Sequence, residues 1–106
     1  MVRNQSVITS KIMSASDVAK YLLDSCEHLQ YFECLMFGSS LLGVGSDYDI
    51  LIIGSDQEAL ARLKNELKVA GKELPLDILY MLPEEAYETE FVVKEKCISL
   101  VDLIRL

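Results

Sequence analysis

Two short apolar runs, each ended by a glycine, place the tightest limit on what this chain can fold into. Cys34–Phe37 stops at Gly38, and the β-branched run Ile50–Ile53 stops at Gly54. Short apolar runs bounded by turn residues are typical of buried strands. Both are far below the roughly 20 residues needed to cross a bilayer. With 106 residues in all, the chain is expected to form one small domain, residues 1–106.

Helical periodicity surrounds these strands. From Ser16, the expected N-cap, apolar residues recur at helical spacing to about Gln30. A second helix is expected after Ser55 or Asp56 and ends at Gly71, which suits a left-handed C-terminal cap. The pattern therefore predicts helices on either side of the strand pair.

The rest of the chain is less regular. Leu76–Met81 predicts a third strand, and Pro83 can open a short helix through Tyr87. Met1–Ala15 shows no clear period and is interpreted as a lead-in, whereas Glu90–Leu106 is ambiguous between helix and strand. The order helix, strand, loop, strand, helix, strand, tail predicts a small α/β domain.

The charge balance limits the class of partner. Ten Lys and Arg against seventeen Asp and Glu give a formal net charge of −7, and no basic stripe suited to a nucleic acid backbone is present. No nucleic acid partner is expected, and an acidic protein that handles phosphates would need a metal cation. The polar N-terminus lacks the apolar run of a signal peptide, so a cytoplasmic protein is expected.

The cysteine and histidine content does not indicate a metal or disulfide framework. Cys26, Cys34 and Cys97 are widely spaced, and His28 is the sole histidine. Buried free thiols and a surface histidine are the simplest interpretation. Three tyrosines are interpreted as packing residues: Tyr48, Tyr80 and Tyr87.

Most of the residues that could bind a ligand or take part in catalysis lie between or at the ends of the first two predicted strands. Asp47 and Asp49 alternate along a strand and so share a face, where two carboxylates repel unless a cation such as Mg²⁺ lies between them. Upstream, the turn at Gly38 and Ser39 can admit a phosphate to the backbone. Asp77 sits among aliphatic residues of the third strand. Three converging carboxylates would form a two-metal site for phosphoryl or nucleotidyl transfer.

Each of these residues also has a purely structural interpretation. Asp47 and Asp49 could be a solvated strand start, and Asp77 a strand-end acid or a salt-bridge partner. Ser39 could cap its turn through local hydrogen bonds, and Ser46 could do the same.

Gly38-Ser39, Asp47-x-Asp49 before an aliphatic strand, and Asp77 in a later strand together resemble the polymerase-β-type nucleotidyltransferase superfamily, in particular its minimal branch. The match covers residues 35–81. The resemblance implies a small mixed β-sheet backed by helices, the nucleotidyltransferase fold. It also implies a Mg²⁺-dependent enzyme that transfers a nucleoside monophosphate from ATP or another nucleoside triphosphate to an acceptor hydroxyl.

The resemblance assigns roles to six residues. Asp47, Asp49 and Asp77 would be catalytic and would bind two Mg²⁺ ions, and Gly38, Ser39 and Ser46 would bind the nucleotide. Many members of this branch are antitoxins paired with an all-helical HEPN-type toxin, and some modify that toxin with AMP. A helical protein partner is therefore expected, with the oligomeric state, a homo-oligomer included, left open.

The chain departs from the family pattern in its glycine–serine loop. Where the family has Gly-Ser-Arg-Ala-Arg-Gly, this sequence reads Gly38-Ser-Ser-Leu-Leu-Gly43, without either arginine, and the loop to Asp47 is shorter. Phosphate binding would then depend on Ser39, Ser40, Ser46, backbone amides and the metal. Two alternatives to an active transferase stay open: a catalytically weak or inactive module that neutralises a helical partner by direct contact, and an α/β domain without metal chemistry.

Overall fold

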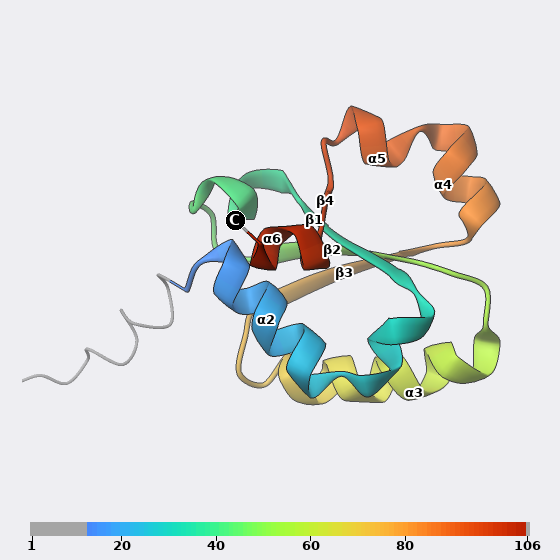
Figure 1. The fold of residues 1–106 in the computed structure, drawn as a ribbon, viewed down its shortest axis with the longest axis horizontal. Coiled ribbons are helices and arrows are strands. Elements are labelled where there is room, and N and C mark those ends of the chain that lie inside the picture. The colour runs from blue at the N-terminus through green and yellow to red at the C-terminus, as the bar shows by residue number, and fades with distance from the viewer. Residues whose placement is uncertain (1–12, 106) are drawn as a thin grey trace, which may run out of the picture.

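The computed structural model describes residues 13–105, which form a mixed sheet of four strands in the order β3-β2-β1-β4 (Figure 1). The strands are β1 (Glu33–Phe37), β2 (Tyr48–Ile53), β3 (Leu76–Met81) and β4 (Ile98–Ser99). β1 runs antiparallel to β2 and β4, and β2 runs parallel to β3. The expected small mixed sheet with helices is confirmed.

The helices cover the two faces of the sheet unequally. One face packs against α2 (Ala15–Ser25), the 3-10 turn η1 (Glu27–Tyr31), α3 (Gln57–Ala70) and α6 (Leu100–Ile104). The other face carries only the short helices α4 (Pro83–Thr89) and α5 (Phe91–Lys94) among the described elements. In Figure 1, α2 and α3 lie below the strands and α4 and α5 above them.

β2 has apolar residues on both faces, which explains why its sequence is an unbroken aliphatic run. Ile50 and Ile52 enter the larger core with Leu22 and Leu63 of the helices, and all four are essentially inaccessible to solvent. Leu51 faces the opposite way and is equally buried in a smaller cluster. A strand covered on both sides loses the polar alternation of a half-exposed strand.

The smaller cluster connects α4 and α5 to the sheet. Leu35 of β1 and Ala86 of α4 are among its buried members. Phe37 meets Phe91 edge to face, with ring centroids 5.1 Å apart. Such an arrangement is favoured by the quadrupoles of the two rings. The face of the sheet that bears this cluster is thus only partly covered.

Two helix boundaries differ from expectation. α2 begins two residues early because Ser14, not Ser16, is the N-cap: its hydroxyl accepts a hydrogen bond from the Asp17 amide at 3.1 Å. The helix ends at Ser25, before η1. Gly71 ends α3 as expected, but with φ −65° rather than in the left-handed region.

The ambiguous tail contains both types of structure. α5 is followed by β4, which pairs with β1, and then by α6, whose N-cap Ser99 accepts from the Asp102 amide at 3.1 Å. Most of the lead-in expected over Met1–Ala15 lies outside the described residues, and Ala15 begins α2. Within residues 13–105, no helix is long and apolar enough to span a bilayer.

Candidate functional site

Asp49 and Asp77 are direct neighbours across the parallel strands β2 and β3. Both side chains lie on the same face of the sheet, close enough for Asp77 to act on the Asp49 carboxyl. The pKa of Asp49 is raised above its usual value by burial first, then by the charge and hydrogen bond of Asp77, and least by the charge of Asp47. The fold therefore brings together two of the three carboxylates expected at the site.

Gly38 is the residue that makes room for the Asp49 carboxylate. Its φ of +80° lies in the left-handed region, which glycine adopts without a steric cost. A Cβ added there would collide with Oδ2 of Asp49. Gly38 is thus required both for its backbone angle and for the close approach of the acid, while its expected contact with a nucleotide stays a prediction.

Ser40 connects the end of β1 to the start of β2 from within η2 (Gly38–Leu42). Its hydroxyl donates to the Phe37 carbonyl at 3.1 Å and accepts from the Asp49 amide at 3.4 Å, and the residue is 3% exposed. These contacts give the hydroxyl a structural role instead of leaving it free for phosphate. The sequence signal for this role was a serine in the turn after a strand, where local hydrogen bonds are common.

Ser39 is exposed, but its hydroxyl lies against the loop that follows η2. A Cβ added at Gly45, where φ is +92°, would come within 2.5 Å of Ser39 Oγ. The Ser39 carbonyl accepts from the Val44 amide at 3.3 Å. Ser39 therefore supports the conformation of the glycine-rich loop while its side chain stays open to solvent on one side.

Ser46 and Asp47 lie on the exposed loop before β2, not in the strand. The expected alternation of Asp47 with Asp49 along one strand is wrong in this respect, because pairing with β1 begins only at Asp49. Both loop residues line a cavity of about 560 Å³ near the start of α2, together with Ser40. Asp49 and Asp77 are not among the described residues that line this cavity.

The carboxylate pair suits a hard cation, although it is smaller than the expected three-acid cluster. Within residues 13–105, no group of three or more His, Cys, Asp or Glu side chains is arranged to hold a metal ion. Mg²⁺ commonly uses one or two carboxylates and completes its shell with water and substrate phosphates. Asp49 and Asp77 supply such a pair, and a cation between them would offset the repulsion that, after burial, raises the Asp49 pKa.

His28 does not lie free on the surface, contrary to expectation. Its Nδ1 is 2.9 Å from Oε2 of Glu66 in α3, and its amide donates to the other carboxylate oxygen at 3.0 Å. Burial alone would raise the pKa of Glu66, but the hydrogen bonds and charge of His28 lower it overall. The pair connects η1 to α3.

The cysteines and tyrosines follow expectation except at Cys97, a free thiol that is only partly buried, and at Tyr87. Cys26 and Cys34 are buried free thiols, and burial raises their pKa values to about 11 and about 12, so neither is a reactive thiolate. Tyr48 packs in the core and donates from its hydroxyl to the Met13 carbonyl at 2.7 Å. Tyr87, expected to pack, is instead 84% exposed on α4.

No protein-family profile, curated protein or solved structure matches this chain.

Proposed function

We propose that the chain is a Mg²⁺-dependent nucleotidyltransferase that transfers a nucleoside monophosphate from ATP, or another nucleoside triphosphate, to an acceptor hydroxyl. The observation that carries the proposal is the Asp49–Asp77 pair, with the Asp49 carboxylate held against the backbone of Gly38. The proposal is supported by two neighbouring carboxylates, a ligand type that Mg²⁺ prefers, beside a glycine–serine turn where a phosphate can approach closely.

The order of elements also supports a nucleotidyltransferase fold. A strand ends at the glycine–serine turn, the next strand carries Asp49, and a parallel neighbour carries Asp77 in register. Asp47 lies two residues before Asp49 on a loop, from which its charge already acts on Asp49. A second Mg²⁺ would require Asp47 to join the pair.

In this proposal the residues have separate roles. Asp49 and Asp77 hold Mg²⁺, which would neutralise charge on the triphosphate and on the leaving group. Ser39, Ser46 and the loop amides would contact phosphate oxygens. An acceptor oxygen attacks the α-phosphorus, its proton passes to Asp77, and the bond to the β-phosphate oxygen breaks to release pyrophosphate.

The acceptor hydroxyl is proposed to belong to a protein partner of the HEPN type. An alternative is a catalytically weak binding module that neutralises the same kind of partner by contact alone. Two observations favour the alternative: the loop has no arginine, and within the described residues Asp47 does not complete a three-ligand group. The two proposals differ in whether the chain binds a magnesium–nucleotide complex.

Thermal unfolding with ATP, in the presence and absence of Mg²⁺, tests the proposal. A ligand at 100 times its dissociation constant adds about 2.7 kcal/mol to the free energy of unfolding. The wild type should gain stability only when both ligands are present, and the double variant Asp49→Asn/Asp77→Asn should not respond. The variant Asp17→Asn/Asp24→Asn, with the same change of charge, should respond like the wild type. A wild type that never responds would leave the binding module as the better account.

A further inference from the structure

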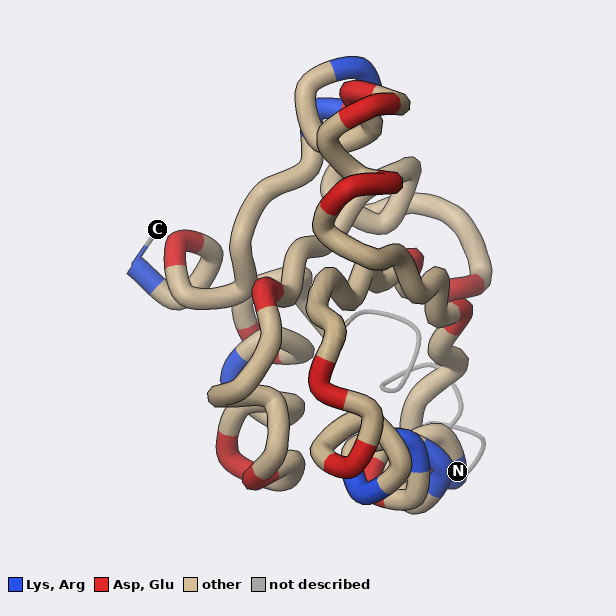
Figure 2. The backbone as a smooth tube through the Cα atoms, turned by 90° about the vertical axis from the view of Figure 1, so that its right-hand side faces the viewer, with Lys and Arg blue, Asp and Glu red and all other residues tan. Residues whose placement is uncertain are grey.

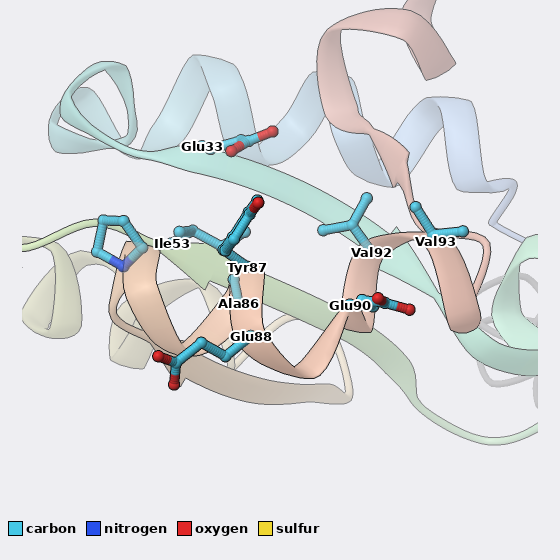
Figure 3. A pocket seen from close by; sticks show the side chains of 9 residues that line it. Glu33, Ile53, Ala86, Tyr87, Glu88, Glu90, Val92 and Val93 are labelled. Atoms are coloured by element: carbon cyan, nitrogen blue, oxygen red, sulfur yellow. The ribbon is translucent and has the colours of Figure 1, made fainter.

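A groove separates α4 and α5 from the ends of the two central strands (Figure 3). It encloses about 620 Å³, within the range of pockets that hold a ligand or a partner's side chains. Nine residues line it: Glu33, Ile53, Pro83, Ala86, Tyr87, Glu88, Glu90, Val92 and Val93.

The floor of the groove is apolar and continuous with the smaller core cluster. Ile53 and Ala86 are buried members of that cluster, and Val92 packs against it. At the margin, Tyr87 and Val93 are 84% and 78% exposed. Large apolar side chains left uncovered beside a core are typical of an interaction surface rather than of an ordinary exterior.

The rim of the groove is acidic. Glu33, Glu88 and Glu90 contribute carboxylates, and none of the described lining residues is basic. α4 itself, PEEAYET, contains three glutamates and no lysine or arginine. Figure 2 shows several acidic segments along this part of the chain, with basic segments at its outer end, and a further group of basic residues in the lower part that contains α3. The groove therefore combines an apolar floor with an acidic rim.

Glu90 forms the corner between α4 and α5, in a backbone conformation that is unfavourable for glutamate. Its φ of 54° and ψ of 31° lie in the left-handed region, where glycine or asparagine fits with less strain. Its amide donates to the Tyr87 carbonyl at 3.2 Å, and its carbonyl accepts from the Lys94 amide at 2.9 Å. A carboxylate is thus placed at the groove despite a backbone cost, as occurs at functional sites.

We propose that this groove binds a protein partner through a segment that presents apolar side chains beside lysine or arginine. The apolar side chains would enter between α4 and the sheet, and the cationic groups would reach the three rim glutamates. Tyr87 adds an exposed ring that can face a cation. The phosphate backbone of a nucleic acid would be repelled by this rim.

The groove and the carboxylate pair lie on the same face of the sheet. Ile53 follows Asp49 by four residues along β2, a separation of about 13 Å at about 3.3 Å per residue. A partner held in the groove would extend toward the pair. The proposal of a partner site rests only on the residues that line the groove, however, and partner binding there does not depend on transferase activity.

Fluorescence anisotropy with a labelled 14-residue peptide of leucine and lysine in amphipathic helical order tests the proposal. The wild type should bind one peptide saturably. The triple variant Glu33→Gln/Glu88→Gln/Glu90→Gln should bind about tenfold more weakly, because exposed ion pairs each contribute a few-fold. A control triple variant with the same charge change outside the groove, Asp24→Asn/Glu27→Gln/Glu58→Gln, should bind within about twofold of the wild type.

A second pair of variants tests the apolar contact. Val93→Ser should weaken binding about fivefold, whereas Val69→Ser, a change at a similarly exposed valine on α3, should not. Circular dichroism and the unfolding midpoint establish that each variant is folded. Absence of wild-type binding, equal weakening by the two triple variants, or equal binding of a leucine–glutamate peptide would overturn the proposal. A wild-type dimer in analytical ultracentrifugation that the Glu33→Gln/Glu88→Gln/Glu90→Gln variant abolishes would also overturn the proposal, because the groove would then hold a second copy of the chain.

Discussion

The carboxylate of Asp49 lies directly against the backbone of Gly38, at the one place where the end of β1 meets the start of β2. The glycine has a positive φ and no side chain, and the acid occupies the space that a Cβ would take. This contact places the backbone of the glycine–serine turn beside the carboxylate pair. The turn and the pair are therefore neighbours in the fold.

Replacing Gly38 with alanine should destabilise the fold and displace the acid. The left-handed backbone costs roughly 1–2 kcal/mol for a residue with a Cβ, and the collision with Asp49 adds to that cost. The free energy of unfolding in urea should fall by about 2–3 kcal/mol.

Gly43→Ala is the matched control for that change. Gly43 has φ +77°, but an added Cβ would meet nothing within 4 Å. In the control, the free energy of unfolding should fall only by the cost of the left-handed backbone, about 1–2 kcal/mol. Equal losses in the two variants would show that the Asp49 carboxylate does not occupy the space beside Gly38.

Neutralising Asp49 should stabilise the protein at neutral pH. The pKa of Asp49 is raised in the folded state by burial and by Asp77, so its ionised form opposes folding. Asp49→Asn should therefore be more stable above the folded-state pKa, by no more than about 1 kcal/mol because the side chain is partly solvated. As pH falls through that pKa, the Asp49 carboxyl of the wild type takes up a proton. The difference in the free energy of unfolding between the variant and the wild type then disappears.

Unfolding by urea at several pH values measures this effect. Asp24→Asn, at an exposed position on α2, serves as the control and should differ little from the wild type at any pH. An Asp49→Asn variant that is less stable than the wild type at neutral pH would mean that the ionised carboxylate supports the fold.

The part of the site that could be predicted from sequence is the part set by strand periodicity and by the glycine. The sequence predicts Asp49 at the acidic start of an aliphatic strand and Asp77 among the aliphatic residues of another, and the glycine after a strand indicates a close approach to its backbone. The exact pairing could not be predicted, because register between parallel strands depends on how the intervening helix α3 packs. Asp47 was misplaced since nothing local to Asp47-Tyr48-Asp49 shows where strand pairing begins.

The hydroxyl of Ser40 should contribute to the stability of the fold, and the hydroxyl of Ser39 should contribute to phosphate binding. Ser40→Ala removes two hydrogen bonds at a buried position and leaves the Asp49 amide without this acceptor, so the free energy of unfolding should fall by about 1–2 kcal/mol. Ser39→Ala should change stability by less than about 0.5 kcal/mol but weaken ATP binding. Calorimetric titration with ATP and Mg²⁺ separates the two effects, and unchanged affinity in Ser39→Ala would assign Ser39 to the turn alone.

The Glu66–His28 pair should make stability depend on acid pH. The pKa of Glu66 is lowered in the folded state, so its contribution is present above the unfolded-state pKa and is lost as pH falls through the folded-state value. Glu66→Gln should remove about 1 kcal/mol near neutral pH and flatten this part of the pH profile.

Glu58→Gln is the control for the Glu66 change. Glu58 lies 3.6 Å from Arg62, but both side chains are largely exposed. An exposed ion pair contributes little, so this variant should stay within about 0.5 kcal/mol of the wild type. If both glutamate variants behave alike, η1 is not held to α3 through Glu66.

Long-range pairing also explains the other differences from the sequence-based expectations. Ile98–Ser99 forms a strand because β1 offers a free edge beside it, which the tail's own sequence does not reveal. His28 was interpreted as a surface residue because its partner, Glu66, is 38 residues away. The extent of helix α3 is predictable from its spacing and from Gly71, which are local signals, whereas the choice of Asp56 over Ser55 as N-cap and the right-handed backbone of Gly71 are not.

Titration of the protein with Mn²⁺, followed by electron paramagnetic resonance, tests the central claim most directly, because Mn²⁺ favours the same oxygen ligands as Mg²⁺. The account predicts one saturable site in the wild type that Mg²⁺ displaces and that Asp49→Asn/Asp77→Asn removes, with Asp17→Asn/Asp24→Asn binding normally. Wild-type protein that leaves all Mn²⁺ free in solution, or a site that survives in the Asp49/Asp77 variant, would contradict it.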